Sequence, residues 1–151
     1  MEELFELRTY IEEGRYADAL VLLGEMEEMS RDDKINKIES FLEILLLHLV
    51  KQHAEKRSTR SWEVSVFNSV YHINKTNKRR KAGGYYLNEN EIMDAIEETY
   101  PIALKHASLE AFEGTLDETE LARKVNEDNI KRQALELIMN ARESAKDKKL
   151  H

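Results

Sequence analysis

The residue types best suited to chemistry gather around one histidine. His48 interrupts the apolar run of residues 44–50, and a neutral imidazole in such a place can act as an acid or a base near pH 7. Lys51 follows three residues later, and Glu28 lies on what we expect to be the preceding antiparallel helix. His48, Glu28 and Lys51 are therefore candidate catalytic residues. The alternative is a histidine that bonds a buried carboxylate and fixes how two helices pack.

A second group of candidates carries positive charge. Residues 51–81 hold nine basic and two acidic residues, a net charge of +7 within a chain whose total is −7. Such a segment can steer an anionic partner locally. The candidate binding residues are Arg57, Arg60, Trp62, Lys78, Arg79, Arg80 and Lys81. The alternative is that these cations pair with the acidic helices of their own fold.

Two functional hypotheses follow from these residues. Cations at 78–81 stand near Tyr85 and Tyr86, and this combination is typical of surfaces that hold phosphates and stack bases. The first hypothesis is a binding or regulatory module whose basic surface, residues 56–60 and 75–81, takes nucleic acid or an acidic protein. The second is an enzyme for a phosphate-bearing substrate, in which His48 is the acid or base and Lys51, Arg57 and Arg60 hold the anion. We favour the module, because the sequence has no recognisable catalytic motif.

The composition excludes several kinds of site. There is no cysteine, which excludes disulfides and thiolate metal sites. The five-residue spacing of His48 and His53 does not suit a zinc motif, and no glycine-rich nucleotide loop occurs. We therefore expect no metal and no cofactor. The apolar runs are too short to cross a membrane and the acidic start does not resemble a secretory signal, so we expect a cytoplasmic protein without a membrane partner.

The elements that position these residues are predicted to be helices. One proline and five glycines in 151 residues leave few tight turns, and apolar residues recur every three or four positions. The pattern predicts an all-α fold, a single compact bundle of five to seven helices over residues 1–145. Residues 146–151 are predicted to form a polar, frayed tail.

Capping signals predict where these helices begin. Three residue pairs resemble capping boxes: Ser30 with Asp33, Asn88 with Glu91, and Asp117 with Glu120. The first pair predicts a break between a helix over 16–29 and a long helix that ends near residue 55. Ser61 is expected to cap a further helix, and Pro101 is expected to kink or interrupt the helix that follows Asn88.

Three short stretches, in this order, resemble a known family. They are EMEEMSR at 25–31, LLLHLVK at 45–51 and RSTRSW at 57–62. Together they are similar to the family catalogued as domain of unknown function twenty-nine, and the resemblance covers roughly residues 1–140. It implies an all-helical fold and a cyanobacterial source, and the stretch over 77–86 resembles a cyanobacterial branch of the family. The resemblance implies no reaction.

Overall fold

The fold is built from helices alone, as the sequence predicts. The computed structural model describes residues 2–79 and 83–150, with side chains described as far as residue 145. Within these residues the chain forms six α-helices and one short 3-10 helix, with no strand beyond an isolated bridge between Lys78 and Tyr85. The elements are α1 (Glu2–Glu12), α2 (Tyr16–Glu55), α3 (Arg60–Asn77), α4 (Glu89–Ser108), η1 (Ala111–Gly114), α5 (Glu118–Ala122) and α6 (Glu127–Leu150).

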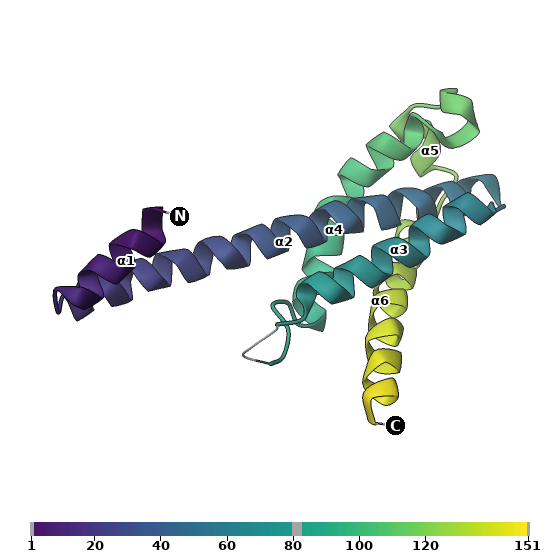
Figure 1. The fold of residues 1–151 in the computed structure, drawn as a ribbon. Helices are drawn as coiled ribbons and strands as arrows, with labels where there is room; N and C mark the ends of the chain where they lie inside the picture. Colours follow the sequence, from purple (N-terminus) through teal and green to yellow (C-terminus); the bar gives the residue numbers. More distant parts are fainter. Residues whose placement is uncertain (1, 80–82, 151) are drawn as a thin grey trace.

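A bundle of four helices holds the core, and an arm projects from it. The C-terminal half of α2 packs against α3, α4 and α6, whereas α1 folds back along the N-terminal part of α2, away from the bundle (Figure 1). The core is apolar and fully enclosed, and α2 supplies its largest share: Ile38, Leu42, Leu45, Leu46 and Leu49. Their spacing of three and four residues puts them on one side of the helix.

The expected break at Ser30 is wrong, because α2 is one helix of 40 residues. No proline or glycine follows Gly24 in this helix, so nothing there stops helical hydrogen bonding. Ser30 and Asp33 are exposed residues inside the helix instead of a cap. Glu28 and His48 consequently lie on the same helix, about 30 Å apart at 1.5 Å per residue, and not on two facing helices.

The other two capping boxes are confirmed. Asn88 Oδ1 accepts from Glu91 N at 2.8 Å and Asp117 Oδ1 accepts from Glu120 N at 2.8 Å, and each glutamate bonds back to the N-cap amide. At α3 the predicted cap is two residues late. Thr59, and not Ser61, caps this helix by accepting from Trp62 N at 3.1 Å.

Pro101 does not interrupt α4, which continues to Ser108. A proline inside a helix leaves the carbonyl four residues earlier without its amide partner. Here both Pro101 and Glu97 lie on the exposed side of α4, where water can bond that carbonyl. At the C-terminus, the backbone of α6 runs to Leu150, into the residues predicted to form the tail.

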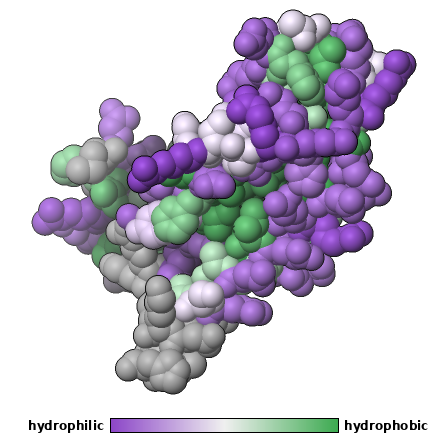
Figure 2. All heavy atoms as spheres, turned by 90° about the vertical axis from the view of Figure 1, so that its right-hand side faces the viewer, coloured by the Kyte–Doolittle hydropathy of each residue, from purple (hydrophilic) through white to green (hydrophobic). Residues whose placement is uncertain are grey.

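Apolar side chains also reach the surface of the bundle. They form a band across the end of the molecule and a smaller group at the top, over the corner made by η1 and α5 (Figure 2). Leu109, just before η1, is 73% exposed. Among the described residues, no helix has an uncharged apolar stretch of the length needed to span a bilayer.

Candidate anion-binding site

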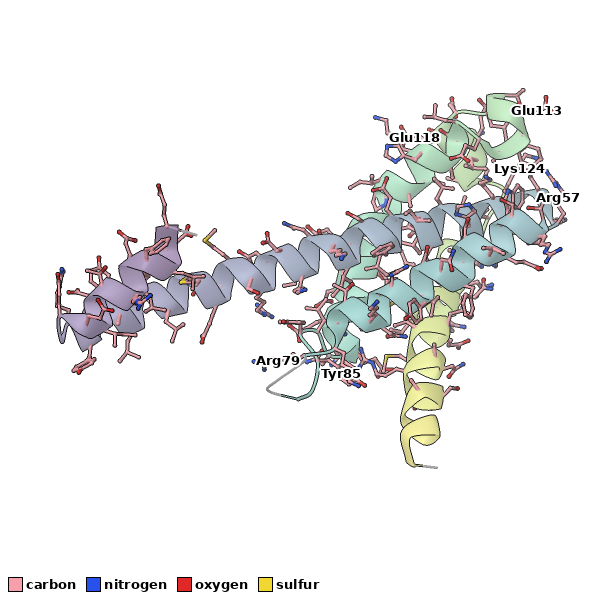
Figure 3. All side chains as sticks on the ribbon, viewed as in Figure 1. Arg57, Arg79, Tyr85, Glu113, Glu118 and Lys124 are labelled. Atoms are coloured by element: carbon pink, nitrogen blue, oxygen red, sulfur yellow. The ribbon has the colours of Figure 1, made fainter. Side chains whose placement is uncertain are left out.

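The two basic segments lie at opposite ends of α3. Arg57 is at the turn between α2 and α3, whereas Arg79 follows the far end of α3 (Figure 3). The 18 residues of α3 separate these ends by about 27 Å. Residues 56–60 and the described residues of 75–81 therefore do not form one continuous surface.

Two cations at the first end, Lys51 and Arg57, are paired within the fold. Lys51 Nζ, on a side chain only 7% exposed, lies 3.0 Å from Glu110 Oε1, and Arg57 lies 3.1 Å from Glu55 Oε1. Both cations also stand over the Trp62 ring, at 4.5 and 4.7 Å from its centroid. The Trp62 ring thus contacts two cations that are each paired with a glutamate, and these contacts join α2 to α3.

His48 does not gather a catalytic group around it. It is partly exposed, and its Nδ1 donates to the Ile44 carbonyl at 2.8 Å, one turn earlier on the same helix. Glu28 is about 30 Å away along α2, and Lys51 is engaged with Glu110. The structure therefore does not bring the candidate catalytic residues together, and the alternative of a carboxylate partner for His48 is not seen among the described residues.

The second basic end forms one wall of a cleft. The cleft lies between the last two turns of α3, the loop that follows α3, and α6, and its volume is about 410 Å³. The residues that line it are Tyr71, Asn74, Lys75, Lys78, Tyr85, Ala141, Arg142 and Ala145. These described residues bring three positive charges and no negative charge into one place.

One asparagine positions the loop wall. Asn77 is fully buried at the end of α3, where its side chain donates to the Leu87 carbonyl at 3.0 Å and accepts from Leu87 N at 2.8 Å. The backbone bridge between Lys78 and Tyr85 adds a second attachment. These bonds fix the loop against α3 and hold Tyr85 beside the cleft (Figure 3).

Arg142 is the least ordinary side chain in the cleft. It is only 8% exposed, its guanidinium carbon stands 3.9 Å from the Tyr85 ring centroid, and its Nε and Nη2 donate no hydrogen bond to any described residue. Burial lowers the pKa of Arg142, opposed by Tyr85 and Glu89 nearby. A buried cation without a hydrogen-bonded counter-ion is costly, so this place favours an anion.

The remaining walls supply exposed cations and flat rings. Lys75 and Lys78 are exposed and form no ion pair with a described residue, so for these two lysines the pairing alternative is not observed. The Lys75 ammonium lies 5.9 Å from the Tyr71 ring centroid. Asn74 donates to the Ile138 carbonyl, whereas its Oδ1 is buried and accepts no hydrogen bond from a described residue. The cleft therefore offers cations, rings and one acceptor.

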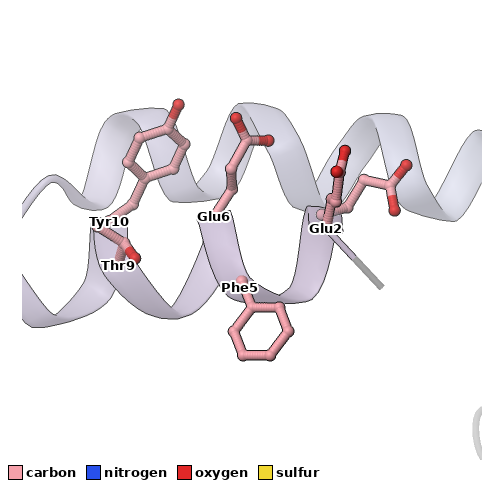
Figure 4. A pocket seen from close by; sticks show the side chains of 6 residues that line it. Glu2, Phe5, Glu6, Thr9 and Tyr10 are labelled. Atoms are coloured by element: carbon pink, nitrogen blue, oxygen red, sulfur yellow. The ribbon is translucent and has the colours of Figure 1, made fainter.

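Two other hollows differ in charge. Tyr85 also lines a second hollow, of about 540 Å³, where Glu27 and Glu28 offset Arg31 and Arg79. A third, of about 510 Å³, runs along α1; Glu6 and Tyr10 point to one side of this helix and Phe5 to the other (Figure 4). Its carboxylates repel an anion, so the cleft at Arg142 is the better anion site.

The predicted binding residues are thus divided. Lys78 lies in the cleft, Arg79 faces the neighbouring hollow, and Arg57, Arg60 and Trp62 are at the other end of α3. Arg80 and Lys81 fall outside the described residues. Sequence reasoning missed Arg142, Tyr71 and Asn74. No three histidine or acidic residues in the described part of the chain are grouped to hold a metal ion.

Comparison with known proteins gives one match. The family model described as "Domain of unknown function DUF29" matches residues 11–137. No curated protein and no solved structure gave a match to the chain.

Proposed function

Since the chain belongs to the DUF29 family, whose description assigns no activity, we propose a function from the cleft itself: the protein is a binding module for nucleic acid. A backbone phosphate lies against Lys75, Lys78 and Arg142, and the adjoining base stacks on a tyrosine ring. The observation that carries the proposal is the buried Arg142, whose Nε and Nη2 have no hydrogen-bond partner among the described residues. Beside it in the cleft are Lys75 and Lys78, which are exposed and form no ion pair with a described residue.

Nucleic acid suits this cleft better than an acidic protein does. A nucleotide presents a phosphate together with a flat base, and base–aromatic stacking is worth about 1–3 kcal/mol. The cleft places Tyr71 and Tyr85 beside its three cations and has a volume of about 410 Å³, within the range of sites for small ligands. A single carboxylate of a peptide leaves most of that volume and both rings unused.

The enzyme hypothesis has less support than the binding hypothesis. It needs His48 close to Arg57, Arg60 and a carboxylate, whereas Nδ1 of His48 bonds its own helix and Arg57 is paired with Glu55. No described arrangement supplies an acid, a base and an anion holder together. An acidic protein partner is kept as an outcome of the test below.

The test is fluorescence anisotropy with labelled single-stranded RNA and duplex DNA at about 50 and 200 mM salt. Lys75→Glu with Lys78→Glu is expected to weaken binding of the single strand at least tenfold. Loss of two phosphate contacts also lowers the slope of log K against log salt by about 1.4. The matched control is Lys37→Glu with Lys105→Glu, which changes the net charge equally at two exposed positions away from the cleft.

Two results contradict the proposal. One is the absence of binding to either nucleic acid at the lower salt concentration, which returns the question to an acidic protein partner. The other is equal weakening by the cleft pair and the control pair, which assigns the effect to net charge alone.

A further inference from the structure

The N-terminal arm exposes most of its large apolar side chains. We define the N-terminal arm as α1 with residues 16–29 of α2. Only Ala19 in the arm is buried, although Leu7, Tyr10, Leu22 and Met26 are partly covered where the two helices meet. Eight large apolar residues of the arm are exposed: Leu4, Phe5, Ile11, Tyr16, Leu20, Val21, Leu23 and Met29.

Five of these eight residues form two stripes. Tyr16, Leu20 and Leu23 are spaced by four and three residues, so they share one face of α2, and Leu4 and Ile11 share a face of α1. In addition, α1 has 11 residues and buries none of them. Helices this short are marginal by themselves in water, so the arm is expected to gain stability from a partner.

A matching face lies on the bundle. The side of α3 that is turned away from its buried residues carries Val64, Phe67 and Tyr71, all at least half exposed. Arg60 stands at one end of this stripe and Lys75 at the other, at the same three- and four-residue spacing. We call this the outer face of α3. It is an apolar strip with a cation at each end.

We propose that the arm of one protomer packs on the outer face of α3 of a second copy, and that the exchange is reciprocal. Charge favours this pairing. Residues 2–29 contain nine acidic and two basic residues, a net charge of −7, whereas residues 60–79 contain four basic and one acidic residue, a net charge of +3. Packing arm against arm instead brings two charges of −7 together, which repel.

The size of the contact is that of a small specific dimer interface. The arm is about 20 Å long and two helices wide, so one face of it covers roughly 400 Å². The outer face of α3 is about 24 Å long and one helix wide, so it limits each contact to roughly 250 Å². Each protomer contributes one arm and one α3 face, which gives roughly 500 Å² per protomer and about 1,000 Å² in total, at the lower end of specific interfaces. The arm lies at one end of the molecule and α3 toward the other (Figure 1), so two antiparallel copies place each arm beside the partner's α3.

The inference does not depend on the proposed function. It requires no nucleic acid, and its test uses Leu20 and Phe67, neither of which lines the cleft. Tyr71 and Lys75 border both surfaces, and they are left unchanged in the test for that reason.

The experiment is sedimentation velocity on the full chain between about 1 and 100 μM protein, a range that spans ordinary dimer affinities. The wild type is expected to reach twice the 17.7 kDa chain mass. Leu20→Ser and Phe67→Ser, at 69% and 71% exposed positions, each weaken dimerisation at least tenfold, because each change alters both contacts of the homodimer. Val21→Ser and Leu109→Ser, equally exposed but on other faces, leave it unchanged.

Mixing the two variants tests the reciprocal exchange. A heterodimer of Leu20→Ser and Phe67→Ser chains has one contact with both surfaces intact, so the mixture is expected to associate more tightly than either variant alone. A wild type that stays monomeric at the highest concentration overturns the inference. A Phe67→Ser chain that still dimerises while Leu20→Ser does not also overturns it, because that result describes arm against arm. Circular dichroism establishes that each variant is folded.

Discussion

Arg142 is the side chain in the cleft that most favours a bound anion. Replacing it is expected to change binding and folding stability in different directions. Replacing it with methionine keeps a long buried stem and removes an unbonded charge, so we expect Arg142→Met to fold with unchanged or higher stability. The same change is expected to weaken single-stranded RNA binding at least tenfold in the anisotropy assay, because it removes the buried cation. Arg132→Met, at an exposed position of the same helix, is the control. Wild-type affinity in Arg142→Met contradicts the assignment of the cleft.

Tyr100 is a buried residue whose hydroxyl group costs stability. Its oxygen has no hydrogen-bond partner among the described residues, while Lys131 Nζ lies 5.2 Å from the ring centroid. Tyr100→Phe keeps the ring and is expected to raise the free energy of unfolding by up to about 1 kcal/mol at neutral pH. Urea denaturation measures this change. Tyr71→Phe, whose hydroxyl is on an exposed residue, is expected to have no effect.

The same tyrosine predicts a difference at high pH. Burial, together with the nearby Glu127, raises the pKa of Tyr100 to about 12, from an ordinary value of about 10. The folded state therefore holds this proton more tightly than the unfolded state does. The contribution of this pKa difference to the free energy of unfolding is complete below pH 10, and it is lost as the pH rises to about 12. We expect the wild type to lose about 2 kcal/mol more than Tyr100→Phe over this range. Parallel losses in the two proteins contradict the assignment.

The role of a single residue can be predicted from the sequence only where its contacts in the fold come from neighbouring residues in the chain. Lys78 was identified because cations and tyrosines are neighbours in the chain, and Asn77 holds those neighbours together. Arg142 carries no such signal, since its burial arises only where α6 meets α3 and the loop. Lys51 was expected to be free for an anion. It is paired because Glu110, 59 residues later, reaches it from the end of α4.

Two glycines in different elements predict opposite effects of one substitution. Gly24 lies within α2 with open space where a Cβ atom would stand, so Gly24→Ala is expected to stabilise the arm by about 0.5–1 kcal/mol. Gly114, at the end of η1, has φ +76°, and a Cβ atom there would lie 2.9 Å from the Leu109 carbonyl oxygen. Gly114→Ala is therefore expected to destabilise by at least about 1 kcal/mol.

Hydrogen exchange at residues 16–30 measures the effect of Gly24→Ala, and urea denaturation measures that of Gly114→Ala. Slower exchange in the arm of Gly24→Ala is the expected result. The prediction is contradicted if both variants lose the same amount of stability, because it rests on the different backbone conformations of the two glycines.

Helices were predicted well where local chemistry decides their ends, and poorly where it does not. Asn88 and Asp117 cap their helices because each has an acidic residue three positions later and a chain that must turn before it. Ser30 has the same local pattern but no glycine or proline near it, so helix propagation continues past it. A capping pattern alone is therefore not sufficient evidence of a break, and the missed continuity of α2 also misplaced Glu28.

At the scale of the whole molecule, the negative charge of the arm is expected to weaken the attraction of the basic cleft for an anionic strand. Glu27 and Glu28, at the base of the arm, line the neighbouring hollow, which shares Tyr85 with the cleft. A chain without residues 1–29 loses a net charge of −7. We expect it to bind single-stranded RNA several-fold more tightly than the full chain at about 20 mM salt, where charges act over about 20 Å. At about 200 mM salt the gain is expected to shrink, because that range falls to about 7 Å.

Two full-length variants distinguish the effect of the arm's charge on RNA binding from the effect of dimerisation. Leu20→Ser keeps every charge and is expected to be monomeric, so any tighter binding by it measures the effect of the dimer alone. Glu27→Gln with Glu28→Gln keeps the arm and removes its two charges nearest the cleft, so it is expected to reproduce part of the gain. Weaker binding by the truncated chain contradicts the repulsion argument, because it makes the arm a contributor of contacts to the bound strand.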